Sequence, residues 1–326
     1  MLVHTLQYSS KLVFGISKFN FKQPKQIFMI LVAGSTGLLG SEICRQLTAQ
    51  QKKVRALVRK TSAPEKIDAL KQMGCSLVEG DFKDRSSLLN ACKGCDIVIS
   101  TVSSTLSRQE GDNIQTVDHD GNLNLIASAK EAGVKQFIFI SFRHQHAMDN
   151  PLTQAKQTAE RAIKSSGMKY TILQASIFME VWLGPALGFN YDEHTAQIPG
   201  DGSKPISYVS YKDVAAFAAA SVDNPVAENQ VLEIGGPEPV SPAQVVKEFE
   251  NNSGHTFTVN YIPVAALEQQ IKEATDPLQK VFAGLMIFYA NGDAMDMKPV
   301  LEKIPVKLHS VQDYANAVLH KEAVII

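Results

Sequence analysis

Three glycines at intervals of three residues, in the stretch ILVAGSTGLLGSE from Ile30 to Glu42, constrain the fold of this chain more than any other feature. An apolar run precedes them and an amphipathic pattern follows, so the stretch predicts a strand, a tight turn and a helix. In that context the glycines permit the turn, the approach of a pyrophosphate to backbone N–H groups, and close helix packing. A glycine turn without a ligand is the alternative interpretation. We assign the whole turn to a dinucleotide: Gly34, Ser35, Thr36, Gly37, Leu38, Leu39 and Gly40.

Short apolar runs and amphipathic segments alternate from Met29 onward. Runs that predict strands cover 29–34, 53–59, 75–81, 96–101, 135–141 and 169–176, and helical patterns cover 41–50, 63–74, 84–94, 120–133 and 154–167. Repeated βα units predict an α/β fold, a doubly wound parallel Rossmann sheet with helices on both faces.

The alternation weakens after about Ser176, where several prolines and loops appear. A helix is expected over 213–222 and a strand near 230–236, followed by helical patterns over 241–254 and 264–274 with little strand signal. We expect a basic leader over 1–28, an NADP-binding Rossmann core over 29–176, and a smaller, mostly helical substrate lobe over 177–326. Elements near 205–236 are expected to return to the core.

The composition of the chain excludes some function classes. With 326 residues, 44% hydrophobic content and a formal net charge of −1, the chain is ordinary globular material without the basic excess of nucleic-acid-binding proteins. It has no run of 18 apolar residues, so we expect no membrane span. We expect a small-molecule substrate, no nucleic acid, and a monomer or homodimer.

The cysteines and the first residues bear on localisation. All four cysteines lie in the first third of the chain, which favours a reducing, cytoplasmic setting over a disulfide framework. Cys92 and Cys95 form a C-x-x-C pair, which suits a redox or zinc site, or a helix C-cap at Gly94. Residues 1–28 contain four lysines and no acid, so either they are a targeting segment or translation starts at Met29.

The end of the second predicted strand selects the dinucleotide. An acidic residue there would bind the ribose 2′-hydroxyl of NAD, whereas an arginine accommodates the 2′-phosphate of NADP. This strand ends in Arg59 and Lys60, so we expect NADP(H), with a solvated surface charge as the alternative for Arg59. By position at the carboxyl ends of later strands, we add further cofactor-binding candidates: Asp81, Phe82, Ser100 and Thr101.

Five motifs together resemble the NmrA-like, or isoflavone-reductase-like, branch of the atypical short-chain dehydrogenases/reductases. They are GSTGLLG, ALVRK, VEGDFKD, AGVKQFIFIS and KQTAERAIKSSGMKYTILQAS, and the match runs from Met29 to about Gly236. The resemblance implies a Rossmann fold, NADP(H) binding and reductase activity. It implies that Ser141 lies near the nicotinamide, that Lys156 is an active-site lysine contacting cofactor or substrate, and that a loop from Ala175 to Phe178 covers the nicotinamide.

The chain departs from the related short-chain dehydrogenases at one position. Those enzymes use Tyr-x-x-x-Lys, in which the ammonium lowers the phenol pKa so that it can shuttle a proton. Four residues before Lys156 stands Leu152, which cannot transfer a proton. Either Lys156 polarises or protonates the substrate, or the reduction needs little acid catalysis, as for a quinone, or no reaction occurs. Lys156 as a solvated helix charge is the remaining interpretation.

Two histidines follow the fifth predicted strand. His144 and His146 form His-x-His without a third ligand at a suitable spacing, so we expect no metal. We take His144 as a candidate general acid or substrate contact, with a loop histidine as the alternative. The carboxylates near Asp118 are interpreted as a helix N-terminus.

Three functions are compatible with these residues. The first is an NADPH-dependent reductase that transfers hydride to a small carbonyl, enone or quinone. The second is a dinucleotide-binding NmrA-like regulator or assembly factor without turnover. An NAD-dependent epimerase is a third, which Leu152 and Arg59 oppose.

Overall fold

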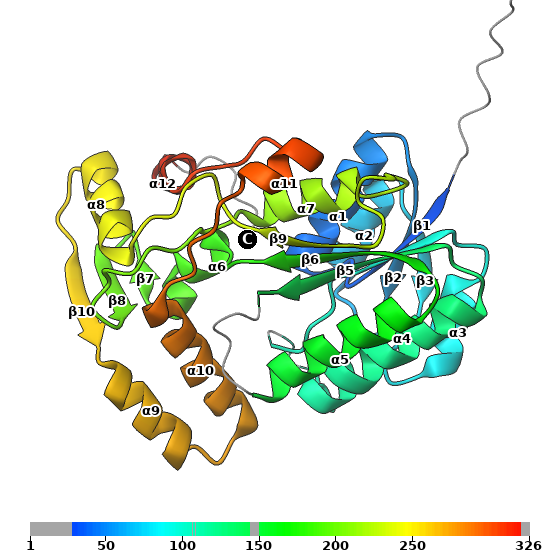
Figure 1. Ribbon diagram of the computed structural model, residues 1–326, viewed down its shortest axis with the longest axis horizontal. Coiled ribbons are helices and arrows are strands. Elements are labelled where there is room, and N and C mark those ends of the chain that lie inside the picture. The colour runs from blue at the N-terminus through cyan, green and yellow to red at the C-terminus, as the bar shows by residue number, and fades with distance from the viewer. Residues whose placement is uncertain (1–27, 106, 108, 144–149, 321–326) are drawn as a thin grey trace, which may run out of the picture.

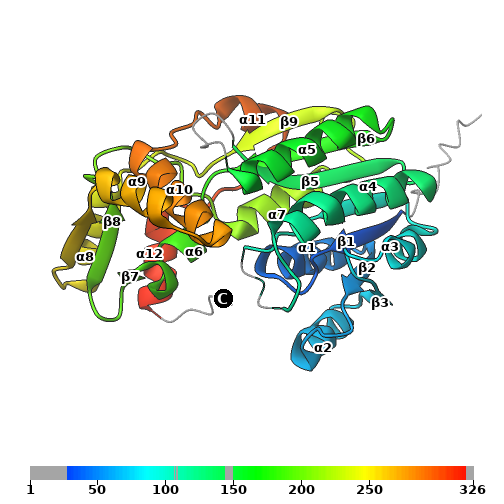
Figure 2. The ribbon, with the colours of Figure 1, turned by 90° about the horizontal axis from the view of Figure 1, so that it is seen from below.

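A seven-stranded sheet and a smaller lobe at one end of it make up the molecule (Figures 1 and 2). The structure is a computed structural model that describes residues 28–143, except 106 and 108, and residues 150–320. His144 and His146, and nearly all of the basic leader, lie outside the described residues.

The sheet is parallel throughout and has the strand order β3-β2-β1-β4-β5-β6-β9. Its central strands read as nearly continuous apolar runs because both of their faces are buried. The chain order reverses between β1 and β4, which is the point where doubly wound sheets bind ligands. The strands are β1 (Met29–Ala33), β2 (Lys53–Val58), β3 (Ser76–Glu79), β4 (Ile97–Ser100), β5 (Gln136–Phe142), β6 (Lys169–Ala175) and β9 (Gln230–Ile234).

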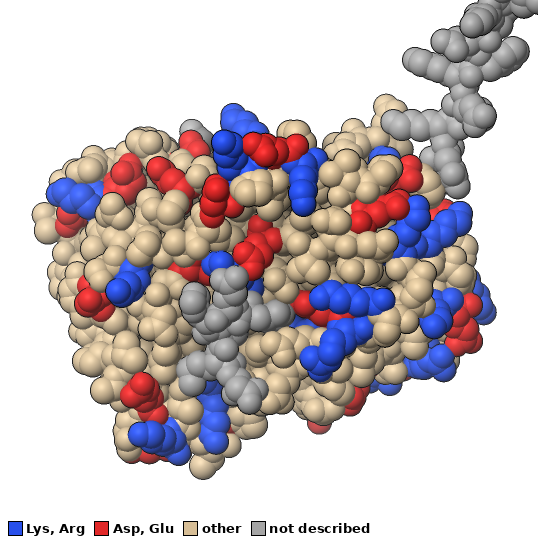
Figure 3. Space-filling view, viewed as in Figure 1, with Lys and Arg blue, Asp and Glu red and all other residues tan. Residues whose placement is uncertain are grey.

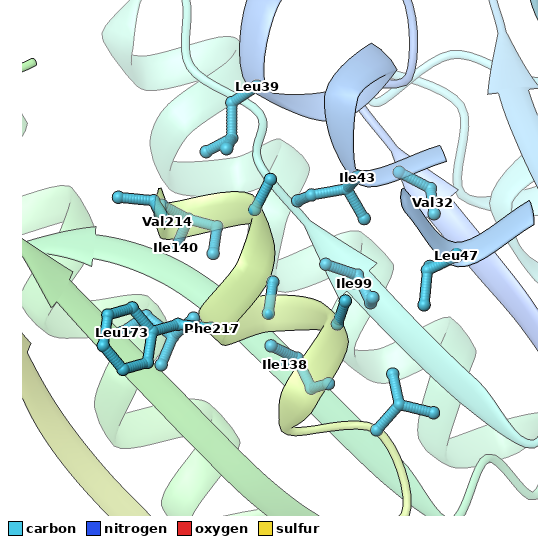
Figure 4. Packing of buried hydrophobic residues seen from close by; sticks show 14 of the residues in the cluster. Val32, Leu39, Ile43, Leu47, Ile99, Ile138, Ile140, Leu173, Val214 and Phe217 are labelled. Carbon is cyan, nitrogen blue, oxygen red and sulfur yellow. The ribbon is translucent and has the colours of Figure 1, made fainter. Parts of the chain in front are cut away.

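Helices cover both faces of the sheet (Figure 1). On one face lie α1 (Leu38–Ala49), α2 (Pro64–Gln72) and α7 (Tyr211–Ala220), and on the other α3 (Arg85–Cys92), α4 (Asp120–Glu131) and α5 (Pro151–Ser165). Figure 4 shows the core on the face covered by α1, α2 and α7. Phe217 and Val214 of α7 and Ile43 of α1 pack there on strand residues such as Ile138. The predicted doubly wound α/β fold is confirmed.

The lobe has a separate core rich in aromatic residues. Phe189, Phe249 and Phe257 pack together there, and Trp182 stacks on Tyr289 with ring centroids 4.9 Å apart. The lobe comprises α6 (Met179–Trp182), β7 (Phe189–Asn190), β8 (Thr195–Pro199), α8 (Pro242–Ser253), β10 (Thr258–Ile262), α9 (Val264–Glu273), α10 (Pro277–Asn291) and α12 (Val311–Leu319). Three further short helices complete the described chain: η1 (Ile114–His119), η2 (Pro185–Leu187) and α11 (Lys298–Lys303).

The lobe differs in one respect from the sequence-based expectation. It contains a three-stranded sheet with the order β10-β8-β7, which the helical patterns did not predict. Strand β10 has only five residues, none of them fully buried, so its sequence gives too short a pattern to mark a strand between helical segments.

Charged side chains of both signs are interspersed on the face shown in Figure 3, in keeping with the net charge of −1. Among the helices of the described part, none has the length and apolar character needed to cross a bilayer.

Candidate functional site

The glycine turn joins β1 to α1 and leaves no room for a side chain at Gly34 or at Gly40. Gly34 has a φ of +83°, and a Cβ there would lie 2.5 Å from Thr101 Oγ1. A Cβ on Gly40 would lie 2.1 Å from the carbonyl oxygen of Gly34, so α1 packs directly on the turn. Gly37 is the N-cap of α1, and no side chain caps the helix amides that follow it. A bare helix N-terminus after a glycine turn fits a pyrophosphate.

The other predicted residues of this turn have different surroundings. The Ser35 hydroxyl is buried and donates a hydrogen bond of 2.7 Å to the Leu57 carbonyl, which ties the turn to β2. Leu39 points into the core, whereas Thr36 and Leu38 are half-buried. Among these four side chains, the Thr36 hydroxyl is therefore the polar group left near the turn surface.

Residues at the end of β4 also hold the turn. The Thr101 hydroxyl lies 3.2 Å from the Ala33 carbonyl oxygen, to which it donates. The Ser100 hydroxyl is fully buried and donates to Asn122 Oδ1. Both predicted residues thus bond to protein groups that shape the sheet edge.

The carboxyl ends of β2 and β3 bring two cations together. The Arg59 guanidinium pairs with Asp112 Oδ2, and Lys83 Nζ lies 2.7 Å from Asp112 Oδ1. Asp81, which follows β3, accepts the backbone N–H of Lys83 at 2.8 Å. Lys60 is exposed. The Phe82 side chain is buried in the core against α4, so closely that a Cβ on Gly121 would lie 2.8 Å from the Cβ of Phe82.

Lys156 extends from α5 to the sheet edge. Its Nζ donates to the carbonyl oxygens of Val102, at 3.2 Å, and Ile140, at 3.4 Å, and lies over the Phe139 ring. The residue is 6% exposed, so it is not a solvated helix charge. Burial lowers the pKa of the Lys156 ammonium, and the negative charges of Asp118 and Glu160 oppose this shift.

Asp118 is buried beside the same edge instead of lying at a solvated helix N-terminus. It belongs to η1, which precedes α4, and its Oδ2 accepts hydrogen bonds from the Ser104 backbone and hydroxyl. Since Val102 bonds to Lys156 and Ser104 bonds to Asp118, the two charged side chains hold the same short segment after β4.

A narrow apolar cavity of about 60 Å³ lies between the ends of β5 and β6 and helix α10. Among its lining groups, the Thr153 hydroxyl is buried and has no hydrogen-bond partner within the described chain. The Ser141 hydroxyl, on β5, is likewise buried without a partner there. The cavity is lined by Phe142, Asn150, Thr153, Ala175, Ser176, Ile177, Gly284, Leu285 and Phe288.

Leu152 stands where related dehydrogenases have the tyrosine. Its side chain is buried in a small apolar cluster with Ile114, Ala155 and Val281, the last from α10. The lobe therefore fills this position with apolar contacts.

The loop from Ala175 to Phe178 was predicted to cover the nicotinamide. Ala175 lines the cavity. Phe178 is half-buried, and its backbone forms a β-bridge with Val209.

Sequence reasoning missed the polar contacts between the lobe and the sheet edge. Asp293, which follows α10, accepts hydrogen bonds from Arg143 after β5 and from Ser176 after β6, at 2.7 and 2.8 Å. Arg143 also pairs with Glu233 of β9. Arg143 and Ser176 could have been found as polar residues at strand ends, but no local pattern marks Asp293.

The cysteines and acidic side chains form no metal site among the residues that the structure describes. Cys92 and Cys95 are both buried, and burial raises the pKa of the Cys92 thiol to about 12. A thiol with so high a pKa is a poor nucleophile and a poor metal ligand.

Comparisons with known proteins agree with the predicted family. The model of the NmrA-like family matches residues 27–317. An isoflavone reductase homolog IRL from Zea mays is 31% identical, over 89% of this chain and 98% of that protein. The photosystem II assembly factor Ycf39 from Synechocystis sp. is 30% identical, over 84% of each chain.

Solved structures share the fold. The structure described as AtPrR2 with NADP⁺ and (+)pinoresinol has a TM-score of 0.72 at 24% identity, covering 90% of this chain and 99% of its own. The NADPH complex of the quinone oxidoreductase QOR2 from Escherichia coli has a TM-score of 0.70 at 23% identity, covering 89% and 99%.

Proposed function

This chain belongs to the NmrA-like family, and we propose that it is an NADPH-dependent reductase of the atypical short-chain type. It transfers hydride to a small carbonyl, enone or quinone held between the sheet edge and the lobe. The position of Lys156 Nζ carries this proposal, because it bonds to carbonyls at the ends of both β4 and β5. The apolar cavity lies beside the next strand end, at Ala175.

The residues of the glycine turn fit NADP(H). The turn at Gly34, Gly37 and Gly40 leads into the uncapped N-terminus of α1, whose free N–H groups suit a pyrophosphate. Glycine is required at Gly34 and Gly40 because a Cβ there would collide with the protein atoms that form the turn. Arg59 supplies a guanidinium for the 2′-phosphate. When bound, the reduced nicotinamide supplies the hydride. The structures of AtPrR2 and of QOR2, whose descriptions name NADP⁺ and NADPH, support this assignment.

Lys156 holds the proton at the sheet edge. A protonated lysine has three N–H donors, and two carbonyls account for two of them. The remaining N–H serves the cofactor ribose or the substrate oxygen. Because Leu152 offers no proton, substrates such as quinones, whose reduced oxygens take protons from water, suit the site better than those that need a phenol.

Two hydroxyl groups complete the proposed substrate site. Thr153 Oγ1 lines the cavity and Ser141 Oγ lies buried on β5, each without a partner among described residues. Buried hydroxyls are usually bonded, so we infer that each bonds to the ligand or its water. The apolar lining favours a ligand with one polar end.

Oxidation of NADPH with a panel of quinones and enones tests this function. We expect turnover with at least one acceptor, and its loss in Lys156→Ala. Lys164→Ala, on the exposed part of the same helix, is the matched control and should retain activity. Absence of turnover with every acceptor, or full activity in Lys156→Ala, would contradict the proposal.

A non-catalytic assembly factor is the second candidate function. The apolar packing of Leu152 against α10 and the likeness to Ycf39, named a photosystem II assembly factor, favour it. It predicts that NADPH raises the melting temperature of the chain although no acceptor is reduced, together with a stable protein partner. Turnover at enzymatic rates would contradict it.

We place this activity in the cytoplasm. All four cysteines are buried and unpaired, which suits a reducing compartment. Organelle targeting by residues 1–28 is the alternative, and expression of a fluorescent fusion of the full chain would separate the two.

A further inference from the structure

Asp112 holds a carboxylate between two cations from different strand ends. Its side chain is 2% exposed, and its Oδ2 accepts hydrogen bonds from Arg59 and from the Ser107 hydroxyl. Its Oδ1 lies 2.7 Å from Lys83 Nζ. Burial opposes the charge on Asp112, but the hydrogen bonds from Lys83, Ser107 and Arg59 outweigh it and lower its pKa to about 2.

This donor set is the kind that binds a phosphate. An arginine fork, a lysine ammonium and a hydroxyl match several oxygens of one anion. The two cations stand just past β2 and β3, the strands whose carboxyl ends meet the adenosine end of a dinucleotide in this fold. The Asp112 carboxylate therefore occupies a position where Arg59, Lys83 and Ser107 could also bind a phosphate.

We propose that Arg59 and Lys83 together form the site for the cofactor 2′-phosphate, and that Asp112 is an internal anion which the phosphate displaces. The inference rests on the proposed use of NADP(H), but not on turnover. Lys83 is thereby a cofactor-binding residue, and Asp112 a residue that determines which dinucleotide binds.

Charge explains why the exchange favours a phosphate. Asp112 places one negative charge between the two cations, and Asp81 adds only a longer contact, with its Oδ2 3.9 Å from Lys83 Nζ. A phosphate dianion in the place of Asp112 brings two negative charges to the same cations. A ribose hydroxyl carries no charge and cannot replace Asp112, so a dinucleotide without the 2′-phosphate leaves the carboxylate in place. If Asp112 stayed beside a bound phosphate, the two anions would repel each other.

Calorimetric titration of the full chain with 2′,5′-ADP and with 5′-ADP tests the proposal. Asp112→Asn removes the competing charge, so we expect about tenfold tighter binding of 2′,5′-ADP, with 5′-ADP changed by less than about twofold. In the Asp112→Asn background, Lys83→Gln should then weaken 2′,5′-ADP about tenfold and spare 5′-ADP. Asp68→Asn, which removes a carboxylate from the exposed pair with Lys71, should change neither affinity.

The outcomes separate this inference from the proposed function. Weaker or unchanged binding of 2′,5′-ADP by Asp112→Asn would contradict the proposal that Asp112 competes with the phosphate. Weaker binding would mean that Asp112 instead orients Arg59 for the phosphate. Failure of the wild-type chain to bind 2′,5′-ADP overturns both the cofactor and this inference. A crystal structure with 2′,5′-ADP gives a readout that needs no variant: Asp112 still paired with both cations would overturn the proposal.

Discussion

Arg143 donates a 2.7 Å hydrogen bond to Asp293, 150 residues later in the chain, and both side chains are at least nine-tenths buried. The contact joins the end of β5 to the segment after α10. It thereby fixes the lobe over the sheet edge that carries Lys156. Buried ion pairs are costly to break from one side, because the partner left behind keeps an uncompensated charge.

Asp293→Ala should therefore lower the free energy of unfolding by about 3 kcal/mol, since Arg143 loses its buried carboxylate partner and keeps contacts such as those with the more exposed Glu233 and the Ala294 carbonyl. Urea unfolding measures the change. Asp68→Ala, which breaks the exposed pair with Lys71, is the control and should cost less than about 1 kcal/mol. Equal effects of the two substitutions would show that the buried pair does not hold the lobe.

Thr153→Val should separate stability from substrate use. Because the Thr153 hydroxyl is buried without a partner among described residues, valine should stabilise the chain by about 1 kcal/mol. The same change should lower kcat/KM for a reduced acceptor about fivefold, if the hydroxyl bonds to the substrate. Thr171→Val is the matched control, because the buried Thr171 hydroxyl bonds to the Ala227 carbonyl and its loss should destabilise by about 1 kcal/mol. Destabilisation by Thr153→Val would contradict the assignment.

Gly40→Ala should lower the stability of the fold, whereas Gly37→Ala should weaken the binding of NADPH. The Gly40 Cβ would lie 2.1 Å from the Gly34 carbonyl oxygen, so Gly40→Ala should destabilise the fold by about 3 kcal/mol. At Gly37 the nearest atom would be 3.3 Å away and φ is −84°, so the fold should tolerate alanine. NADPH titration of Gly37→Ala should nevertheless show weaker binding, because the methyl group stands at the exposed face of the turn. Unchanged affinity would place the pyrophosphate elsewhere.

His309 should make stability depend on pH. Its hydrogen bond to the buried Asp213 raises the pKa of His309 above the usual 6.5, although burial opposes this shift. Of the nearby charges, Lys212 lowers the pKa of His309 and Asp313 raises it. The raised pKa favours the protonated folded state, so this stabilisation is complete below about pH 6.5 and is lost as the pH rises through the folded pKa. Melting temperatures of wild type and His309→Gln should therefore converge at alkaline pH. A constant difference between the two would show that His309 does not titrate with folding.

The glycine turn and the strand ends were predictable because they follow from local patterns. Parallel strands place their carboxyl ends at one edge, so Arg59, Asp81, Ser141 and Ala175 could be assigned to that edge without coordinates. The assignment did not extend to side-chain direction. Ser35, Leu39 and Phe82 lie in the right segments, yet the Ser35 hydroxyl bonds to Leu57 and the other two side chains pack in the core.

The contacts that shape the proposed site join residues distant in sequence. Lys83 meets Asp112 across 29 positions, and no local periodicity encodes such a pair. The cavity at Thr153 exists only because α10 packs over α5 and buries Leu152 against Val281.

The sequence by itself determined the fold and the edge of the sheet that carries the site, because glycine spacing and alternating βα patterns are local and leave few topologies open. Only the tertiary structure decided which anion faces Arg59, what surrounds Leu152 at the position of the tyrosine, and how the lobe packs on α5, the helix that carries Lys156. Those outcomes depend on packing and ion pairs between distant segments, whose partners become known only when the chain is folded.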